Sequence, residues 1–118
     1  MNSLELTYEI AKILDSKKGE DIKALEVREM TSIGDYFVIA SGANLPQVKA
    51  MSDEVEEKLS KMGLEPKRIE GYQTASWILL DYYDVIVHIF LRETREFYSL
   101  ERLWAGAQQV DLSKVLTD

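Results

Sequence analysis

The sequence predicts a single α/β domain over residues 1–118, in which a mixed β-sheet is flanked by helices. A chain of 118 residues, 46% of them hydrophobic, is sufficient for one core. Apolar residues recur at helical spacing in residues 6–14 and 48–62, whereas residues 36–40 and 85–91 are almost continuously apolar, which is typical of strands. The predicted order is helix, two strands, helix, three strands and helix (α-β-β-α-β-β-β-α).

The first predicted element is an amphipathic helix. Asn2 and Glu5 have the spacing of a capping box, and Gly19 is placed to end the helix. Its buried face is predicted by Leu6, Ile10, Ile13 and Leu14. Two strands follow at residues 22–27 and 36–40, and the second should be central because it is apolar on both faces.

A long helix is predicted after the dipeptide Ser41-Gly42, with Asn44 as its N-cap and Gly63 just beyond its end. Its apolar face consists of Val48, Met51, Val55, Leu59 and Met62. The carboxylates on its other side are interpreted as a solvated face: Asp53, Glu54, Glu56 and Glu57.

Three strands are predicted next, at residues 67–70, 77–81 and 85–91, with a tight turn at 81–84 that makes the last two an antiparallel hairpin. A short final helix is expected to pack three side chains on the sheet: Phe97, Leu100 and Trp104. Its charged residues are expected to face water: Arg95, Glu101 and Arg102. Residues 106–118 form a polar tail that is expected to pack loosely or not at all.

Composition restricts the function. The net charge of −7 repels phosphate backbones and attracts basic partners, so little direct contact with nucleic acid is expected, although many acidic proteins carry such charge for solubility alone. The absence of cysteine excludes disulfides, thiolate nucleophiles and cysteine-bound zinc. No apolar run is long enough to span a bilayer and the N-terminus does not resemble a signal peptide, so we expect a cytoplasmic protein without membrane contact.

An enzymatic function has weak support. The Gly-containing turn at Ser41-Gly42, between a buried strand and a helix, is able to hold a phosphate, but the paired carboxylates that would hold magnesium beside it are missing. The single histidine, His88, lies in an apolar strand and is interpreted as a packing residue rather than a general base. We therefore expect no catalytic residues, metal or cofactor.

A protein interface is the better-supported site. Alternation along residues 77–84 places Trp77 and Leu79 on one strand face and Ile78 and Leu80 on the other. Aromatic residues dominate binding hot spots, and the neighbouring Asp81 would suit a basic partner. Two interpretations have equal weight: a central strand covered on both faces, or an exposed docking patch.

Three motifs, at residues 35–42, 77–90 and 97–104, with Glu70-Gly71 between the first two, resemble the ribosomal silencing factor family, also called the Iojap family. The resemblance covers nearly the whole chain. It implies a nucleotidyltransferase-like fold without the catalytic carboxylates. It also implies that the protein is a homodimer when free and binds the large ribosomal subunit at ribosomal protein fourteen. There it would block the joining of the small subunit when nutrients are scarce.

Transferred to this chain, the resemblance gives a partner-binding set of apolar and acidic residues: Trp77, Leu79, Leu80, Asp81, Tyr82 and Asp84. Tyr83 stands where the family usually has glycine, which affects the turn that directs Asp84. Two alternatives remain open. One is a nucleotidyltransferase-like enzyme on the same fold, and the other is a self-associating scaffold that uses the Trp77 strand or the final helix.

Overall fold

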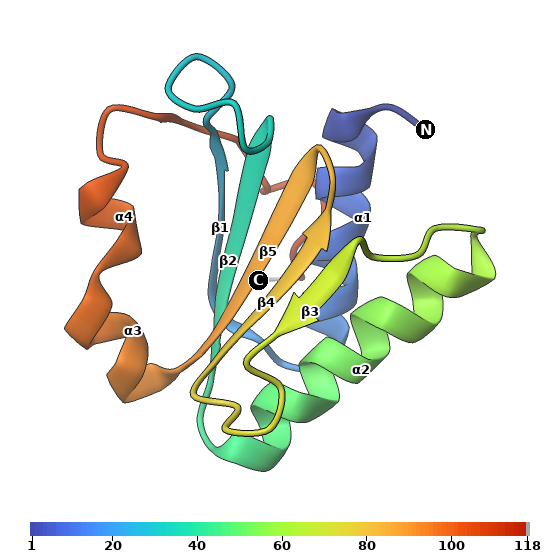
Figure 1. Cartoon of the computed structure of the whole chain (residues 1–118), viewed down its shortest axis with the longest axis vertical. Helices are drawn as coiled ribbons and strands as arrows, with labels where there is room; N and C mark the ends of the chain where they lie inside the picture. Colours follow the sequence, from blue (N-terminus) through green and yellow to red (C-terminus); the bar gives the residue numbers. More distant parts are fainter. Residues whose placement is uncertain (118) are drawn as a thin grey trace.

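One mixed sheet with the strand order β3-β4-β5-β2-β1-β6 organises the chain, as shown by a computed structural model that describes residues 1–117 (Figure 1). Central strands β2 and β5 are parallel, and every other neighbouring pair is antiparallel. The elements are α1 (Ser3–Ser16), β1 (Glu20–Glu26), β2 (Tyr36–Gly42), α2 (Leu45–Lys61), β3 (Arg68–Glu70), β4 (Trp77–Tyr82), β5 (Val85–Leu91), α3 (Arg92–Tyr98), α4 (Leu100–Leu103) and β6 (Gln108–Gln109).

The predicted order of elements is confirmed as far as the final helix, and so are the central position of β2 and the β4–β5 hairpin. All seven residues of β2 are buried, because helices cover the sheet on both faces. In the hairpin, Tyr82 pairs with Val85, so only Tyr83 and Asp84 form the loop. None of the helices in the described part of the chain combines the length and apolar character needed to cross a membrane.

Both predicted helix caps are confirmed. The Asn2 side chain accepts the Glu5 N–H at 2.8 Å while the Glu5 carboxylate accepts the Asn2 N–H at 2.9 Å, which completes the capping box. The Asn44 side chain caps α2 by accepting the Gln47 N–H at 2.9 Å. Each such cap is worth about 1 kcal/mol of helix stability.

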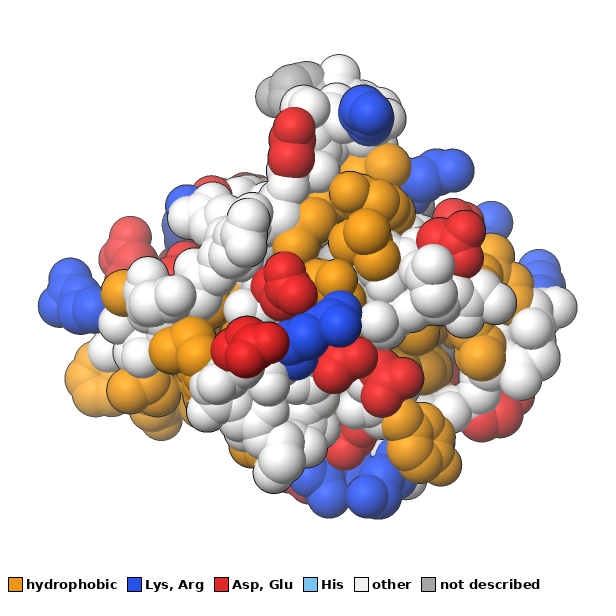
Figure 2. Space-filling view, turned by 90° about the horizontal axis from the view of Figure 1, so that it is seen from above, with side chains coloured by type: hydrophobic (Ala, Val, Ile, Leu, Met, Phe, Trp, Pro, Cys, Tyr) orange, Lys and Arg blue, Asp and Glu red, His pale blue; other side chains and the backbone are white. Residues whose placement is uncertain are grey.

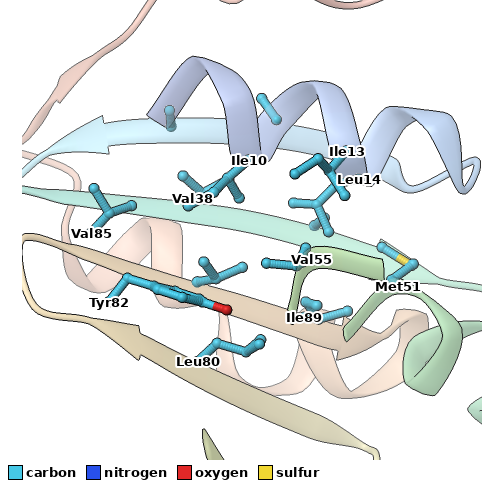
Figure 3. Packing of buried hydrophobic residues seen from close by; sticks show 14 of the residues in the cluster. Ile10, Ile13, Leu14, Val38, Met51, Val55, Leu80, Tyr82, Val85 and Ile89 are labelled. Carbon is cyan, nitrogen blue, oxygen red and sulfur yellow. The ribbon is translucent and has the colours of Figure 1, made fainter. Parts of the chain in front are cut away.

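The larger core lies between the sheet and helices α1 and α2. Ile10 and Leu14 of α1 and Val55 of α2 are completely buried there. Figure 3 shows these side chains converging on Val38 and Ile89 from the central strands. Burying a large aliphatic side chain stabilises the fold by about 1.5–3 kcal/mol, so this layer fixes the orientation of the sheet.

A smaller core occupies the opposite face, under α3 and α4. It consists of Leu25, Val27, Phe37, Ile39, Ile86, Phe90 and Leu100. Trp77, Leu79 and Trp104 pack against it from its margin and stay partly exposed. This second layer is thin, because α3 and α4 together provide fewer buried side chains than α1 and α2.

Two predictions for the final helix are wrong. Phe97, expected on the sheet, is 81% exposed, and Arg95, expected in water, is 6% exposed. The Arg95 guanidinium donates to the Ser41 Oγ at 2.8 Å and to the Glu101 carboxylate at 3.0 Å. The cause is a break at Ser99, whose left-handed backbone (φ 48°, ψ 54°) separates α3 from α4, so one helical period does not run through both.

Exposed apolar side chains consequently gather outside α3 and α4, at the left of Figure 2. Phe97, Tyr98 and Leu103 contribute to them. Leu100 and Trp104 do pack on the sheet as predicted.

The tail after Gly106 packs more closely than expected. Strand β6 pairs with the edge of β1, and the Val110 N–H donates to the Ala24 carbonyl at 2.8 Å. Leu112 is 7% exposed in the larger core. The scattered apolar residues of this segment therefore complete the side of the sheet that carries α1.

Candidate functional site

Strand β4 divides the predicted partner-binding residues between the two faces of the sheet. Trp77 and Leu79 are partly exposed beside the smaller core. Leu80 is completely buried and Tyr82 is 5% exposed, both in the larger core beneath α1 and α2 (Figure 3). The expectation that Leu80 contacts a partner is wrong, since helices cover its face of the strand. Tyr82 is a core residue for the same reason.

Trp77 has an ordered aromatic setting. Its indole N–H donates to the Nδ1 of His88 at 3.1 Å. Its ring centroid lies 4.8 Å from that of Phe90 and 5.0 Å from that of Tyr98. Beside it is an open pocket lined by Glu70, Gly71, Trp77 and Leu79. An aromatic and an aliphatic side chain therefore line one shallow, solvent-accessible site.

Gly71 determines how the chain enters β4. Its φ of +80° is in the left-handed region, and a Cβ added there would be 2.2 Å from the Trp77 carbonyl oxygen. Real Cβ atoms do not approach so closely, so glycine is required at this position. The Glu70-Gly71 dipeptide thus has a structural role next to Trp77.

Asp81 belongs to the hairpin turn. It is 5% exposed, its carboxylate accepts the Tyr83 N–H at 2.8 Å, and its other oxygen is 3.7 Å from the Arg68 guanidinium. This bond confirms the turn-capping interpretation of Asp81. With one oxygen bonded to the backbone and the other facing Arg68, the carboxylate has little capacity left for an external cation.

Asp84 is exposed at the tip of the hairpin. Its carbonyl oxygen accepts the N–H groups of Asp35 and Tyr36, at 2.7 and 3.1 Å, which fixes the backbone of the turn. Tyr83 takes a left-handed φ of 69° and is 61% exposed. Because a strand rises about 3.3 Å per residue, the tip is roughly 20 Å from Trp77. Trp77 and Asp84 therefore lie at opposite ends of the β4–β5 hairpin.

His88 is a buried packing residue, as predicted. Burial lowers the pKa of His88 to about 4, so the imidazole is neutral at neutral pH. Its Nδ1 accepts from Trp77, which leaves the proton on Nε2, and this atom is buried with no hydrogen-bond partner among residues 1–117. A base with so low a pKa and one occupied nitrogen is poorly suited to proton transfer at pH 7.

The Ser41-Gly42 turn is occupied by the chain itself. The Gln47 side chain accepts the Ala43 N–H at 2.7 Å, and Asn44 accepts the Gln47 N–H. A phosphate at this helix terminus would have to displace both bonds. Within residues 1–117, no three His, Asp or Glu side chains are grouped closely enough to hold a metal ion.

Two residues of the exposed site were missed from the sequence. Glu70 lies opposite Leu79 in the β3–β4 register and pairs with Arg68 at 2.8 Å. Tyr98 reaches Trp77 from α3. The β3–β4 register places Glu70 in the site, and the position of α3 places Tyr98 there. Residue spacing along the chain predicts neither the register nor the position of the helix.

The chain is similar to one group of known proteins along its whole length. A family model described as "Ribosomal silencing factor during starvation" matches residues 1–118. The ribosomal silencing factor RsfS of Halalkalibacterium halodurans is 38% identical over 117 residues, covering 99% of this chain and 100% of that protein. The Mus musculus protein named "Mitochondrial assembly of ribosomal large subunit protein 1" is 33% identical over 98 residues, covering 80% of this chain and 43% of that protein.

A crystal structure of a protein from Chromobacterium violaceum has the same fold. Its TM-score is 0.87 at 33% sequence identity, covering 96% of this chain and 93% of that chain. The similarity in sequence to the family and the similarity in fold to this structure therefore both extend over nearly the whole chain.

Proposed function

Because the chain belongs to the ribosomal silencing factor family, we propose that it represses translation by binding the large ribosomal subunit through ribosomal protein fourteen. Bound there, it blocks the small subunit from joining and lowers translation when nutrients are scarce. The name of the Mus musculus relative, which refers to the ribosomal large subunit, supports this choice of partner. The proposal includes a cytoplasmic location, a homodimer when free, and a nucleotidyltransferase-like fold that performs no chemistry.

The mechanism is steric. A domain measuring 33 × 33 × 30 Å occupies a substantial area of any surface on which it is bound. Two bodies cannot occupy the same surface, so the blocker needs only sufficient affinity and the right position. Steric blocking needs no bound phosphate. The helix terminus after Ser41-Gly42 is already capped by side chains of the chain itself.

The observation that carries the proposal is the partly exposed pair Trp77 and Leu79 on an acidic chain. Both side chains line an open pocket and are backed by a buried aromatic layer, which is the setting of binding hot spots. Asp84, exposed at the tip of the hairpin, adds negative charge toward a basic protein, whereas the charge of Glu70 is already paired with Arg68. The net charge of −7 acts in the same direction.

Sedimentation with purified large subunits tests this surface. Trp77→Ala should weaken binding by about tenfold or more, since truncating a hot-spot residue costs 1 to several kcal/mol. Leu79→Ala should also weaken binding. Leu103→Ala makes the same change at a leucine that is 73% exposed on α4 and does not line the Trp77 pocket, and it should bind like the wild type.

Circular dichroism spectra that match the wild type would show that the variants are folded. Unchanged binding by both Trp77→Ala and Leu79→Ala would refute the assigned surface. Failure of the wild-type protein to sediment with large subunits would refute the function itself.

A further inference from the structure

Trp77 and His88 are diagonal neighbours on the β4–β5 hairpin. Trp77 pairs with Phe90, and His88 pairs with Leu79, two residues along each strand. Diagonal positions on one sheet face are within reach of large side chains. The indole N–H of Trp77 accordingly donates a hydrogen bond to Nδ1 of His88 at 3.1 Å. The orientation of the partly exposed tryptophan is thus tied to His88, which is itself 5% exposed.

This bond leaves the indole little choice of position. If the acceptor were absent, the N–H would lose this bond and the ring would gain by rotating toward water, away from Phe90, whose ring centroid is 4.8 Å away. A ring that samples several positions has to be ordered again on binding, which lowers affinity. The acceptor therefore fixes the ring before a partner arrives.

A histidine at position 88 destabilises the fold relative to an apolar side chain, so packing alone does not account for it. Its Nε2 is buried and finds no hydrogen-bond partner in the described part of the chain, and a buried polar atom in that state destabilises the fold. An apolar side chain would fill the same space beside Phe37 and Phe90 without that penalty. The polar atom that the structure uses is Nδ1, and its partner is Trp77.

We propose that His88 is a positioning residue for partner binding. By accepting the indole N–H, His88 holds the Trp77 ring over Phe90. In this position the solvent-accessible side of the Trp77 ring lines the pocket with Glu70 and Leu79. This inference rests on the proposed function and assigns a role to a buried residue outside the contact surface. His88 touches no partner and acts through Trp77.

Two substitutions of matched shape test the inference. Asn and Leu branch at the same atom, but Asn places an acceptor oxygen where His88 has Nδ1, whereas Leu places a methyl group there. His88→Leu should bind large subunits about fivefold more weakly than the wild type, the factor for one hydrogen bond of ordinary strength. His88→Asn should bind within about threefold of the wild type.

Stability should follow the opposite order. His88→Asn buries an additional amide and should unfold at a lower urea concentration than His88→Leu. A purely structural role predicts that the more stable variant binds at least as well. The indole N–H resonance of Trp77, assigned by its loss in Trp77→Phe, should shift in His88→Leu and stay close to its wild-type position in His88→Asn.

The outcomes separate the inference from the function on which it rests. If the wild type binds large subunits and the Leu and Asn variants bind equally well, the inference is wrong and the proposed function stands. If His88→Leu weakens binding equally in the wild-type and Trp77→Phe backgrounds, His88 does not act through the indole and the inference is also wrong. If the wild type does not bind, both are wrong.

Discussion

Lowering the pH from 7 to 5 should destabilise this protein through one residue, His88. It is the single histidine of the chain, so it is the side chain whose ordinary pKa lies within this range. Burial lowers the folded-state pKa of His88 from 6.5 to about 4. The unfolded chain therefore binds a proton as the pH falls below 6.5, while the folded protein does not, and stability is lost until the pH approaches 4.

The magnitude follows from these two pKa values. At pH 5 the unfolded histidine is almost fully protonated and the folded one is almost fully neutral. The pH then lies 1.5 units below the unfolded pKa, so at 1.36 kcal/mol per unit the free energy of unfolding should fall by about 2 kcal/mol. Carboxylates, whose ordinary pKa values are near 4, contribute little above pH 5.

Urea unfolding at the two pH values, followed by circular dichroism, measures this loss. His88→Asn is the matched control, because it keeps a polar side chain at the site and removes the titrating group. The variant should lose much less stability than the wild type between pH 7 and 5. An equal loss in both proteins, or a wild type that is more stable at pH 5, would show that His88 is charged in the folded state.

Three further substitutions probe the hairpin and its entry. Tyr82→Phe removes a buried hydroxyl that has no hydrogen-bond partner within the described residues, so it should be neutral or stabilise the fold by up to about 1 kcal/mol. A loss of stability in urea unfolding would indicate that the hydroxyl is hydrogen-bonded. Gly71→Ala should cost about 2–4 kcal/mol and weaken ribosome binding by displacing Trp77, whereas Gly63→Ala should cost only about 1 kcal/mol. Gly63 has a similar φ of +83° but nothing within 4 Å of an added Cβ, so equal losses would contradict the steric argument. Tyr83→Gly should raise stability by about 0.5–1 kcal/mol, because glycine relieves the left-handed φ of an exposed turn residue, and a lower melting temperature would oppose this.

Local signals in the sequence were sufficient for the elements and their caps. The capping box was predicted from Asn2 and Glu5, three positions apart, and the second N-cap from Asn44 at the start of the apolar helical period; such contacts depend on little beyond the helix itself. The central position of β2 followed from its continuously apolar run. The β4–β5 hairpin followed from the acidic turn between two apolar segments, and the Asp81 side chain does cap that turn.

Non-local geometry decided the rest. Alternation separated Trp77 from Leu80 correctly, but both faces of β4 are apolar, so the sequence could not indicate which face the long helices cover. The left-handed turn at Ser99 interrupts the final helix, and with it Phe97 is exposed and Arg95 is buried. A helical period read from the sequence assumes an unbroken helix, so it could not predict this. The bond between Trp77 and His88 depends on a register that joins residues from two strands.

Subunit joining is the most direct measurement of the central claim. Purified large subunits are incubated with increasing amounts of the protein, small subunits are added, and the fraction of joined ribosomes is measured by sedimentation. Joining should fall as the wild-type protein saturates the large subunit, and Trp77→Ala should require a higher concentration to produce the same block. Full joining at concentrations where the protein is bound to every large subunit would contradict the account.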